Sequence, residues 1–239
     1  DEIAQPYVDK GIIKVVADQW VDNWDAANAN KIMENILTAQ QNKIDAVVAS
    51  NDGTALGALT AMKAQKLAGV VPISGQDATA DGCNSIVKGE LTVSILKDVR
   101  NLSPIAVDMT DKLLKGEAVT GLEEYTMAEL TNDPAKTGNV MALFLPVQQV
   151  NQDNVDELVV KSGFQKAEDV YRDVEAPTSS AGGAAAGGEK ILVGLSFSDF
   201  ATERWKTEQE LLEKLLREKG YDVVWQEAAH DVKAQNDQI

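Results

Sequence analysis

Short apolar runs alternate with helical patterns through the first two-thirds of the chain. The apolar runs, which predict buried strands, span residues 12–16, 46–49, 70–73 and 91–96. Apolar side chains recur at helical spacing over residues 27–41, 56–66 and 103–114. Strands that alternate with helices form a parallel sheet with helices on both faces. The sequence therefore predicts an α/β fold built from doubly wound, Rossmann-like parallel sheets.

The composition changes abruptly after residue 175. Residues 176–188 contain only Ala, Pro, Thr, Ser and Gly. Such a stretch cannot build a core, so we predict a flexible linker over residues 175–189. No strand precedes its glycines and no Gly-Lys-Ser/Thr follows them, which argues against a phosphate-binding loop. Beyond it, residues 190–195 and 221–225 predict strands, and helices are predicted from about residue 202 and over 232–239.

Charge and composition exclude several classes of function. The formal net charge of −16 disfavours binding to nucleic acid or to an anionic membrane surface. Cys83 and His230 are the single cysteine and the single histidine, which leaves no disulfide, multi-cysteine metal site or Ser-His-Asp triad to expect. We expect no cofactor and no metal. No apolar run reaches membrane-spanning length and no signal-peptide pattern is present, so we expect no membrane insertion.

Several motifs together point to one family. They are IKVVADQWVDNW at residues 13–24, KIMEN at 31–35, NKIDAVVASND at 42–52, ISGQDA at 73–78 and Glu203-Arg204-Trp205. With these motifs the chain resembles the type I periplasmic sugar-binding proteins of ABC transporters, in particular their D-xylose-binding members. The resemblance covers nearly everything except the linker. It implies two Rossmann-like lobes that bind a sugar, and no enzyme activity.

The order of the segments differs from that of the family. Such proteins begin with a segment like residues 190–239 and end with one like residues 1–174. The resemblance therefore implies a circular permutant, with two or three βα units of one lobe missing, and an engineered origin. Residues 1–96 with 140–174 would form the C-terminal-type lobe. Residues 97–139 would form the hinge and a helix of the other lobe, and residues 190–239 the start of that incomplete N-terminal-type lobe.

A pyranose requires flat aromatic walls for its C–H faces and buried polar groups for its hydroxyls. The resemblance implies Trp24 and Trp205 as the walls, and it implies four hydrogen-bonding residues: Asn51, Asp77, Lys97 and Arg204. Trp20 and Trp225 are interpreted as structural residues.

Each site residue also has a structural alternative. Asn51 by itself is typical of a turn with positive φ, and Asp77 of a helix cap. Lys97 and Arg204 are also typical of solvated charges, and a lone tryptophan is more often part of a core. The motif matches favour the sugar-binding roles.

The expected function is binding of D-xylose or a related pentose, and because part of one lobe is missing, this chain is expected to bind it weakly or not at all. The alternatives are the effector domain of a sugar-responsive transcription regulator, and an assembly module that dimerises or recruits a missing fragment. A regulator would carry a helix-turn-helix and a basic surface, and neither is found. The parent protein is expected outside the cytoplasm, in the periplasm or lipid-anchored at the cell surface, and to serve an ABC transporter permease or a membrane sugar sensor. The chain itself is expected to be made recombinantly in the cytoplasm.

Overall fold

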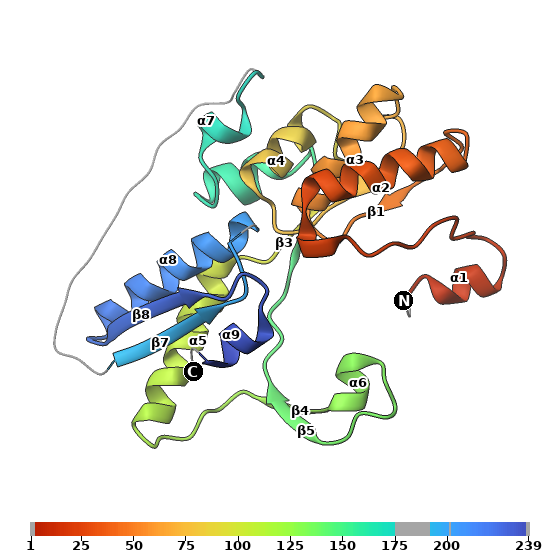
Figure 1. Cartoon of the computed structure of the whole chain (residues 1–239). Coiled ribbons are helices and arrows are strands. Elements are labelled where there is room, and N and C mark those ends of the chain that lie inside the picture. Colours follow the sequence, from red (N-terminus) through yellow and green to blue (C-terminus); the bar gives the residue numbers. More distant parts are fainter. Residues whose placement is uncertain (1–2, 175–191, 201, 238–239) are drawn as a thin grey trace. The chain divides into compact units, whose positions relative to one another are not determined.

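The structure is a computed structural model that describes residues 3–174, 192–200 and 202–237 (Figure 1). The described residues form two compact units. The first comprises mainly residues 3–96 and 149–174, and the second residues 97–148, 192–200 and 204–237. The predicted linker over 175–189 lies outside the described residues.

The first unit alternates helices with short strands. Its elements are α1 (Gln5–Asp9), the 3-10 turn η1 (Asp22–Trp24), α2 (Ala26–Ala39), β1 (Val47–Val48), α3 (Asp52–Ala64), β2 (Ile73–Ser74), α4 (Ala80–Val87), β3 (Ser94–Leu96), β6 (Gln148–Val150) where the chain returns, the π-helix η2 (Asp156–Lys161) and α7 (Ala167–Val170). The strand predictions at 46–49, 70–73 and 91–96 and the helix predictions at 27–41 and 56–66 are thus confirmed within a few residues.

β1, β2 and β3 of the first unit run in parallel. β1 pairs with β2, with Val47 opposite Ile73. A parallel bridge between Ser74 and Val93 continues the arrangement toward β3, and β3 pairs with β6. The carboxyl ends of β1, β2 and β3 therefore lie at one edge, where open α/β sheets bind their ligands.

An aliphatic core holds these strands and helices together. Its largest completely buried side chains are Leu37, Leu59, Met62, Ile73, Ile86, Leu91 and Leu96. They come from α2, α3, β2, α4, β3 and, for Leu91, the turn before β3, so burial of apolar area fixes the strand ends relative to one another.

The predicted strand at residues 12–16 is wrong. The chain is in neither helix nor strand between residues 13 and 21, and Ile12 and Val15 are 68% and 58% exposed. A strand needs a hydrogen-bonded neighbour as well as an apolar run, and an apolar pattern alone does not supply that pairing.

The second unit contains a parallel pair of strands and an antiparallel hairpin. Its elements are α5 (Val99–Leu114), β4 (Glu123–Thr126), α6 (Met127–Thr131), β5 (Asn139–Ala142), β7 (Leu192–Phe197), α8 (Glu203–Glu218), β8 (Asp222–Glu227) and α9 (Val232–Asp237). β7 and β8 are parallel, as predicted, with Leu195 opposite Trp225. Their small core consists of Val107, Leu216, Tyr221 and Val223.

Two features of the second unit differ from the prediction. β4 and β5 pair antiparallel, with Glu123 opposite Ala142, although only parallel sheets were predicted. Cover on both sheet faces was also expected, yet Leu192 of β7 and Val224 of β8 are 63% and 52% exposed. The core of the second unit packs against Val193 and Leu195 instead, which lie on the opposite face of the β7–β8 pair. Apolar side chains therefore cover that face.

Within the described residues, no helix has the length and apolar composition that crossing a membrane requires.

Candidate functional site

Two of the predicted site residues lie at the carboxyl ends of neighbouring parallel strands. Asn51 follows β1 and Asp77 follows β2, and both side chains are buried. The Asp52 amide donates to the Gln76 carbonyl at 2.9 Å, and Gln76 Nε2 donates to the Ser50 carbonyl at 3.2 Å. These bonds hold the two loops together, so the structure brings Asn51 and Asp77 to one place.

Asn51 is the N-cap of α3. Its Oδ1 accepts hydrogen bonds from the Thr54 amide and the Thr54 hydroxyl, both at 2.8 Å, within a capping box. Its φ of −154° is extended, so the alternative of a turn with positive φ is wrong. The capping bonds use Oδ1, which makes Nδ2 the part of Asn51 that can donate to a ligand.

Asp77 does not cap the helix that follows it. Thr79 is the N-cap of α4, and its hydroxyl accepts from the Gly82 amide at 3.0 Å. Asp77 has a φ of 96°, and its amide donates to the Ile95 carbonyl at 2.8 Å. This positive φ is one that Asn, Asp and Gly tolerate better than other residues. The hydrogen bond to Ile95 holds the backbone of Asp77 beside β3.

Sequence reasoning missed the residue that ties this edge together, Asp52. Its Oδ2 accepts from the Thr79 amide at 2.8 Å and the Thr79 hydroxyl at 3.2 Å, and its Oδ1 accepts from Ser94 Oγ at 2.7 Å. Ser94 Oγ in turn accepts from the Ala78 amide at 3.0 Å. One carboxylate therefore links the chain after β1 to the loop after β2 and to β3. Its sequence signal is the Asn-Asp-Gly run directly after a strand.

Burial dominates the ionisation of this carboxyl. Desolvation raises the pKa of Asp52 from 3.8 to about 6, although hydrogen bonds from Ser94 and Thr79 act in the opposite direction. The nearby charge of Asp77 adds a smaller upward contribution to the pKa. We call Asp52 and the hydrogen bonds that its carboxylate accepts the clasp. The charge of Asp52 changes near pH 6.

Gly75 and Gly82 allow the loop after β2 and helix α4 to lie close to the Asp52 carboxylate. A Cβ atom placed on Gly75 would overlap Asp52 Oδ1, and one placed on Gly82 would overlap Asp52 Oδ2. Both positions therefore exclude any larger residue while the clasp is intact.

Gly82→Ala is expected to lower the free energy of unfolding by about 1–3 kcal/mol, because overpacking outweighs the better helix propensity of alanine. Gly53→Ala is the matched control in α3, where the added Cβ meets only ordinary contacts with Asn51 at 3.7 Å. Urea denaturation measures both variants. A Gly82→Ala protein at least as stable as Gly53→Ala contradicts this description of the clasp.

Trp24 lies in the first unit and lines a cavity with both apolar and polar walls. It ends η1, has a φ of 56° and is 47% exposed. The cavity has a volume of about 320 Å³ and lies between the chain at 16–21, α2 and β1. Asn51 and Asp77 do not line it, but Ser50, next to Asn51, and Thr54, which Asn51 caps, do. Trp20 also lines it and is 93% exposed, which shows that its interpretation as a structural core residue is wrong.

Arg204 and Trp205 lie in the first turn of α8, in the second unit. The Arg204 guanidinium lies 4.5 Å from the centroid of the Trp205 ring, so a cation covers one face of this tryptophan. Arg204 Nη2 also pairs with Glu208 Oε2 at 3.0 Å. Trp225 contacts Phe200 at a ring separation of 5.5 Å and is 45% exposed, so its structural interpretation stays a prediction.

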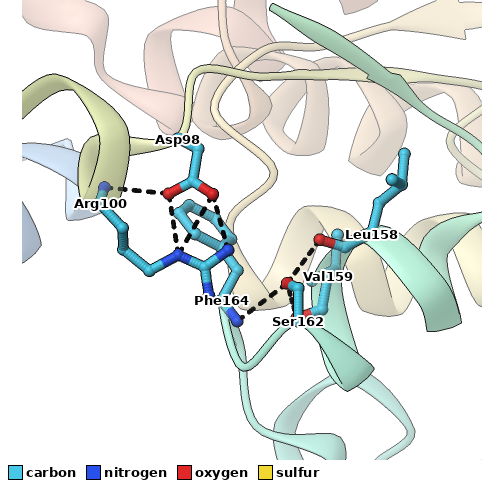
Figure 2. Close-up of polar contacts among 6 residues, drawn as sticks. All are labelled: Asp98, Arg100, Leu158, Val159, Ser162 and Phe164. Atoms are coloured by element: carbon cyan, nitrogen blue, oxygen red, sulfur yellow. Dashed lines mark hydrogen bonds and ion pairs between the residues drawn. The ribbon is translucent and has the colours of Figure 1, made fainter.

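Lys97 directly follows β3 and precedes the N-cap of α5. That cap is Asp98, whose Oδ1 accepts from the Arg100 amide at 2.9 Å and whose Oδ2 pairs with Arg100 Nη2 at 2.6 Å (Figure 2). Burial acts to raise the pKa of Asp98, but hydrogen bonds from Arg100 and its charge together lower the pKa below the ordinary value. The cap fixes the backbone next to Lys97.

In the first unit, hydrogen bonds of the Ser162 side chain fix the backbone after η2 in a similar way. Ser162 Oγ donates to the Leu158 carbonyl at 2.7 Å and accepts from the Phe164 amide at 3.3 Å (Figure 2). These bonds end η2 and turn the chain toward α7. That the residues of both units form one site stays a prediction.

Among the described residues, no group of three or more His, Cys, Asp or Glu side chains is arranged to hold a metal ion.

Comparisons with known proteins agree with this fold. Residues 1–118 match the family described as a periplasmic binding protein domain. The chain is 44% identical over 165 residues to the D-xylose-binding periplasmic protein of Escherichia coli (strain K12), covering 69% of this chain and 48% of that protein. It is 43% identical over 170 residues to the D-xylose-binding periplasmic protein of Haemophilus influenzae (strain ATCC 51907 / DSM 11121 / KW20 / Rd), covering 71% of this chain and 49% of that protein.

Solved structures show the same architecture. A carbohydrate transporter solute-binding protein from Chloroflexus aurantiacus, in complex with D-glucose, matches with a TM-score of 0.58 and 27% identity, covering 70% of this chain and 54% of that one. A solute-binding protein from Clostridium phytofermentans with bound β-D-glucose matches with a TM-score of 0.57 and 26% identity, covering 71% and 53%.

These matches define the fold class. The chain has the α/β fold of the type I periplasmic sugar-binding proteins, as the sequence motifs implied. Two of the relatives named above are D-xylose-binding periplasmic proteins, and one of the solved structures is a carbohydrate transporter solute-binding protein. The chain spans about half the length of the curated relatives it matches.

Proposed function

We propose that this chain binds a monosaccharide, and D-xylose before other sugars. The observation that carries the proposal is the pair of buried polar side chains, Asn51 and Asp77, at the ends of adjacent parallel strands. The Asn51 amide donates to a sugar hydroxyl, and the Asp77 carboxylate accepts from hydroxyls. The names of the two relatives with 44% and 43% identity support D-xylose as the first sugar to test.

The remaining site residues are proposed in the roles that the family resemblance implies. Trp24 stacks on one face of the sugar, and Trp205 on the other with the ring face that Arg204 leaves open. Lys97 and Arg204 donate charge-assisted hydrogen bonds to hydroxyls.

Tryptophan fluorescence tests the proposal. D-xylose is expected to change the emission in a saturable way, and D-glucose, D-galactose and D-ribose less strongly at equal concentration. Asp77→Asn is expected to weaken binding by about 10- to 100-fold, because one charged acceptor becomes a neutral amide while volume and tolerance of positive φ are kept. The control is Asp45→Ala, an exposed carboxylate just before β1. Unchanged affinity in Asp77→Asn contradicts the proposed site.

We also propose that the segments stand in circularly permuted order through engineering, with lobes and hinge bounded as predicted from the sequence. Supporting this, Arg204 and Trp205 lie in the first helix of a strand–helix–strand unit, β7–α8–β8. Separate alignment of residues 190–239 and 1–174 with one relative tests the order. A match of residues 190–239 to the carboxyl-terminal part of that relative contradicts it.

The proposed setting follows the named relatives, which are periplasmic. The parent protein would act outside the cytoplasm and deliver sugar to an ABC transporter permease or a membrane sugar sensor. A homodimer or a complementing fragment also stays a proposal, which the exposed Leu192 of β7 and Val224 of β8 support. Sedimentation velocity over a wide concentration range tests it, and a monomer at every concentration contradicts a homodimer.

A further inference from the structure

The backbone after β2 takes two consecutive positive φ angles, 96° at Asp77 and 48° at Ala78. Alanine rarely adopts this region, so contacts around it must hold the conformation. The Asp77 amide donates to the Ile95 carbonyl at 2.8 Å. The Ala78 amide donates to Ser94 Oγ at 3.0 Å, and the Ala78 carbonyl accepts from Gln165 Nε2 at 3.2 Å. The place of the Asp77 carboxylate therefore depends on residues outside the proposed sugar contacts.

Asp52 anchors this arrangement, although its side chain is completely buried and cannot touch a ligand. Its Oδ1 accepts from Ser94 Oγ at 2.7 Å, and its Oδ2 accepts from the amide and the hydroxyl of Thr79 at 2.8 and 3.2 Å. Ser94 holds Ala78, and Thr79 is the residue after Ala78. Asp52 also follows Asn51 directly in the chain. The clasp therefore acts on the backbone at both proposed sugar-binding strand ends.

The clasp requires an acceptor at Asp52, because several donors converge on its carboxylate. Ser94 Oγ accepts from the Ala78 amide, so the Ser94 hydroxyl has its hydrogen available for Asp52. Thr79 Oγ1 accepts from the Gly82 amide at 3.0 Å, so the same holds for the Thr79 hydroxyl, and the Thr79 amide can only donate. An ionised carboxylate only accepts, whereas a protonated carboxyl brings a donor hydrogen of its own. Protonation of Asp52 therefore opposes at least one of these bonds and loosens the segment that they hold.

We propose that Asp52 is a positioning residue for the sugar: its ionised carboxylate holds the backbone of Asp77 and Ala78 in the conformation that binds, and uptake of a proton by Asp52 weakens sugar binding. This role rests on the proposed function, because it acts through Asn51 and Asp77. A ligand favours the protonation state in which its site is assembled, so proton binding and sugar binding are linked. The chain thus binds sugar according to the charge of a residue that the sugar does not touch.

Asp77 in the loop after β2 and Cys83 on α4 are the titratable groups next to Asp52 in the described part of the chain, whereas β3 presents the uncharged hydroxyl of Ser94. Burial raises the pKa of the Cys83 thiol, so the thiol stays neutral. Burial also raises the pKa of Asp52 to about 6. Bonds from Ser94 and Thr79 act to lower this pKa, and the charge of Asp77 adds to the rise. Asp77 is therefore the charge through which a ligand can act on Asp52.

Sugar binding is expected to lower the pKa of Asp52. Sugar hydroxyls that donate to Asp77 stabilise its negative charge and reduce its repulsion of Asp52. Affinity is therefore complete above about pH 6 and falls as the pH drops through that value. The contribution of Asp52 to folding runs in the opposite direction, because a raised pKa stabilises the fold at low pH. A weaker fold at Asp52 therefore does not explain the loss of affinity.

Fluorescence titration of the whole chain with D-xylose from about pH 5 to 8 tests the proposal. Asp52→Asn keeps the volume, carries no charge at any pH and places an amide N–H₂ among the donors. It is expected to bind D-xylose about tenfold more weakly than the wild-type chain at the upper end of this range. The matched control is Asp45→Asn, which changes an exposed carboxylate and is expected to keep the wild-type affinity. The ratio of the wild-type affinity to the Asp52→Asn affinity is expected to fall toward one below pH 6, and taking this ratio cancels the titration of groups that both chains share.

Ser94→Ala tests the same role and leaves the carboxyl of Asp52 in place. The bond from Ser94 acts to lower the pKa of Asp52, so its loss is expected to move the midpoint of the pH dependence above 6. Sugar binding is expected to weaken as well, because the Ala78 amide loses its acceptor. If Ser94 only stabilised the fold, the midpoint would not move. This variant decides the question even if Asp52→Asn does not fold.

The outcomes separate this role from the proposed function. A ratio of affinities that stays constant from about pH 5 to 8, or an unmoved midpoint in Ser94→Ala, overturns the positioning role and leaves sugar binding intact. Failure of D-xylose to change the fluorescence at any pH contradicts the proposed function and, with it, the link to sugar. The sugar-free chain then tests the clasp by itself. The NMR signals of the Ala78 and Thr79 amides are expected to shift with a midpoint near pH 6, and signals that do not shift overturn the dependence of the clasp on charge.

Discussion

Asp52→Ala is expected to lower the free energy of unfolding by about 3–5 kcal/mol, the largest loss for any single substitution named here. The carboxylate is completely buried and accepts from the Thr79 amide, the Thr79 hydroxyl and Ser94 Oγ. Alanine leaves these donors buried without an acceptor and opens a small cavity among them. Urea denaturation followed by circular dichroism measures the loss.

Asp45→Ala is the control, because Asp45 is an exposed carboxylate close to Asp52 in sequence. Its effect is expected to stay within about 0.5 kcal/mol. If Asp52→Ala costs no more than this control, Asp52 does not hold the strand ends together. The capping of α3 by Asn51 would then carry the loop geometry alone.

The stability of the chain is expected to depend on pH through Asp52. The folded pKa of about 6 exceeds the ordinary value of 3.8, so the folded protein binds this proton more tightly than the unfolded chain does. The contribution of Asp52 is therefore complete below about pH 4 and is lost as the pH rises through 6. The shift corresponds to about 3 kcal/mol between these limits.

Other carboxyl groups change the stability of the fold with pH in the opposite direction. The pKa of Asp98 is lowered, and so is that of Glu129, whose carboxylate accepts from the Thr126 hydroxyl and amide, so both stabilise the fold above their ordinary pKa. The difference between the wild-type chain and Asp52→Asn cancels these contributions. The wild-type chain is expected to lose stability relative to Asp52→Asn as the pH rises from 4 to 7. A difference that stays constant over this range contradicts the raised pKa of Asp52.

Much of the fold was predictable because its signals are local. The helical spacing of Ile32, Ile36 and Leu37 indicated α2, and the same kind of pattern indicated α3 and α5. The apolar run at 46–49 indicated β1 because both faces of a parallel strand are buried in typical α/β folds. In these cases, side chains close in sequence determine the element.

The errors arose where the structure depends on distant pairing. Strand formation at residues 12–16 requires a hydrogen-bonded neighbour, and the apolar run contains no information on whether that neighbour is engaged. The β4–β5 hairpin was missed because Glu123 and Glu124 give β4 little apolar character. Trp20 was misjudged because residue type alone does not determine burial.

The candidate site was predictable only in part, for the same reason. Asn51 and Asp77 were found because they end apolar runs within recognisable motifs. Asp52 was missed because its partners Thr79 and Ser94 lie 27 and 42 positions away along the chain. No local pattern shows that these three side chains meet. Only the parallel order of β1, β2 and β3 brings them together.

Site-resolved NMR during a D-xylose titration tests the central claim most directly. The side-chain amide of Asn51, the backbone amide of Asp77 and the indole N–H of Trp24 are expected to shift together along one saturable curve, because a bound sugar contacts all three residues. The exposed Trp20 indole, which has no proposed contact with sugar, serves as the internal reference. Unchanged signals of Asn51 and Asp77 up to about 50 mM D-xylose, a concentration that would reveal even millimolar affinity, would contradict the account.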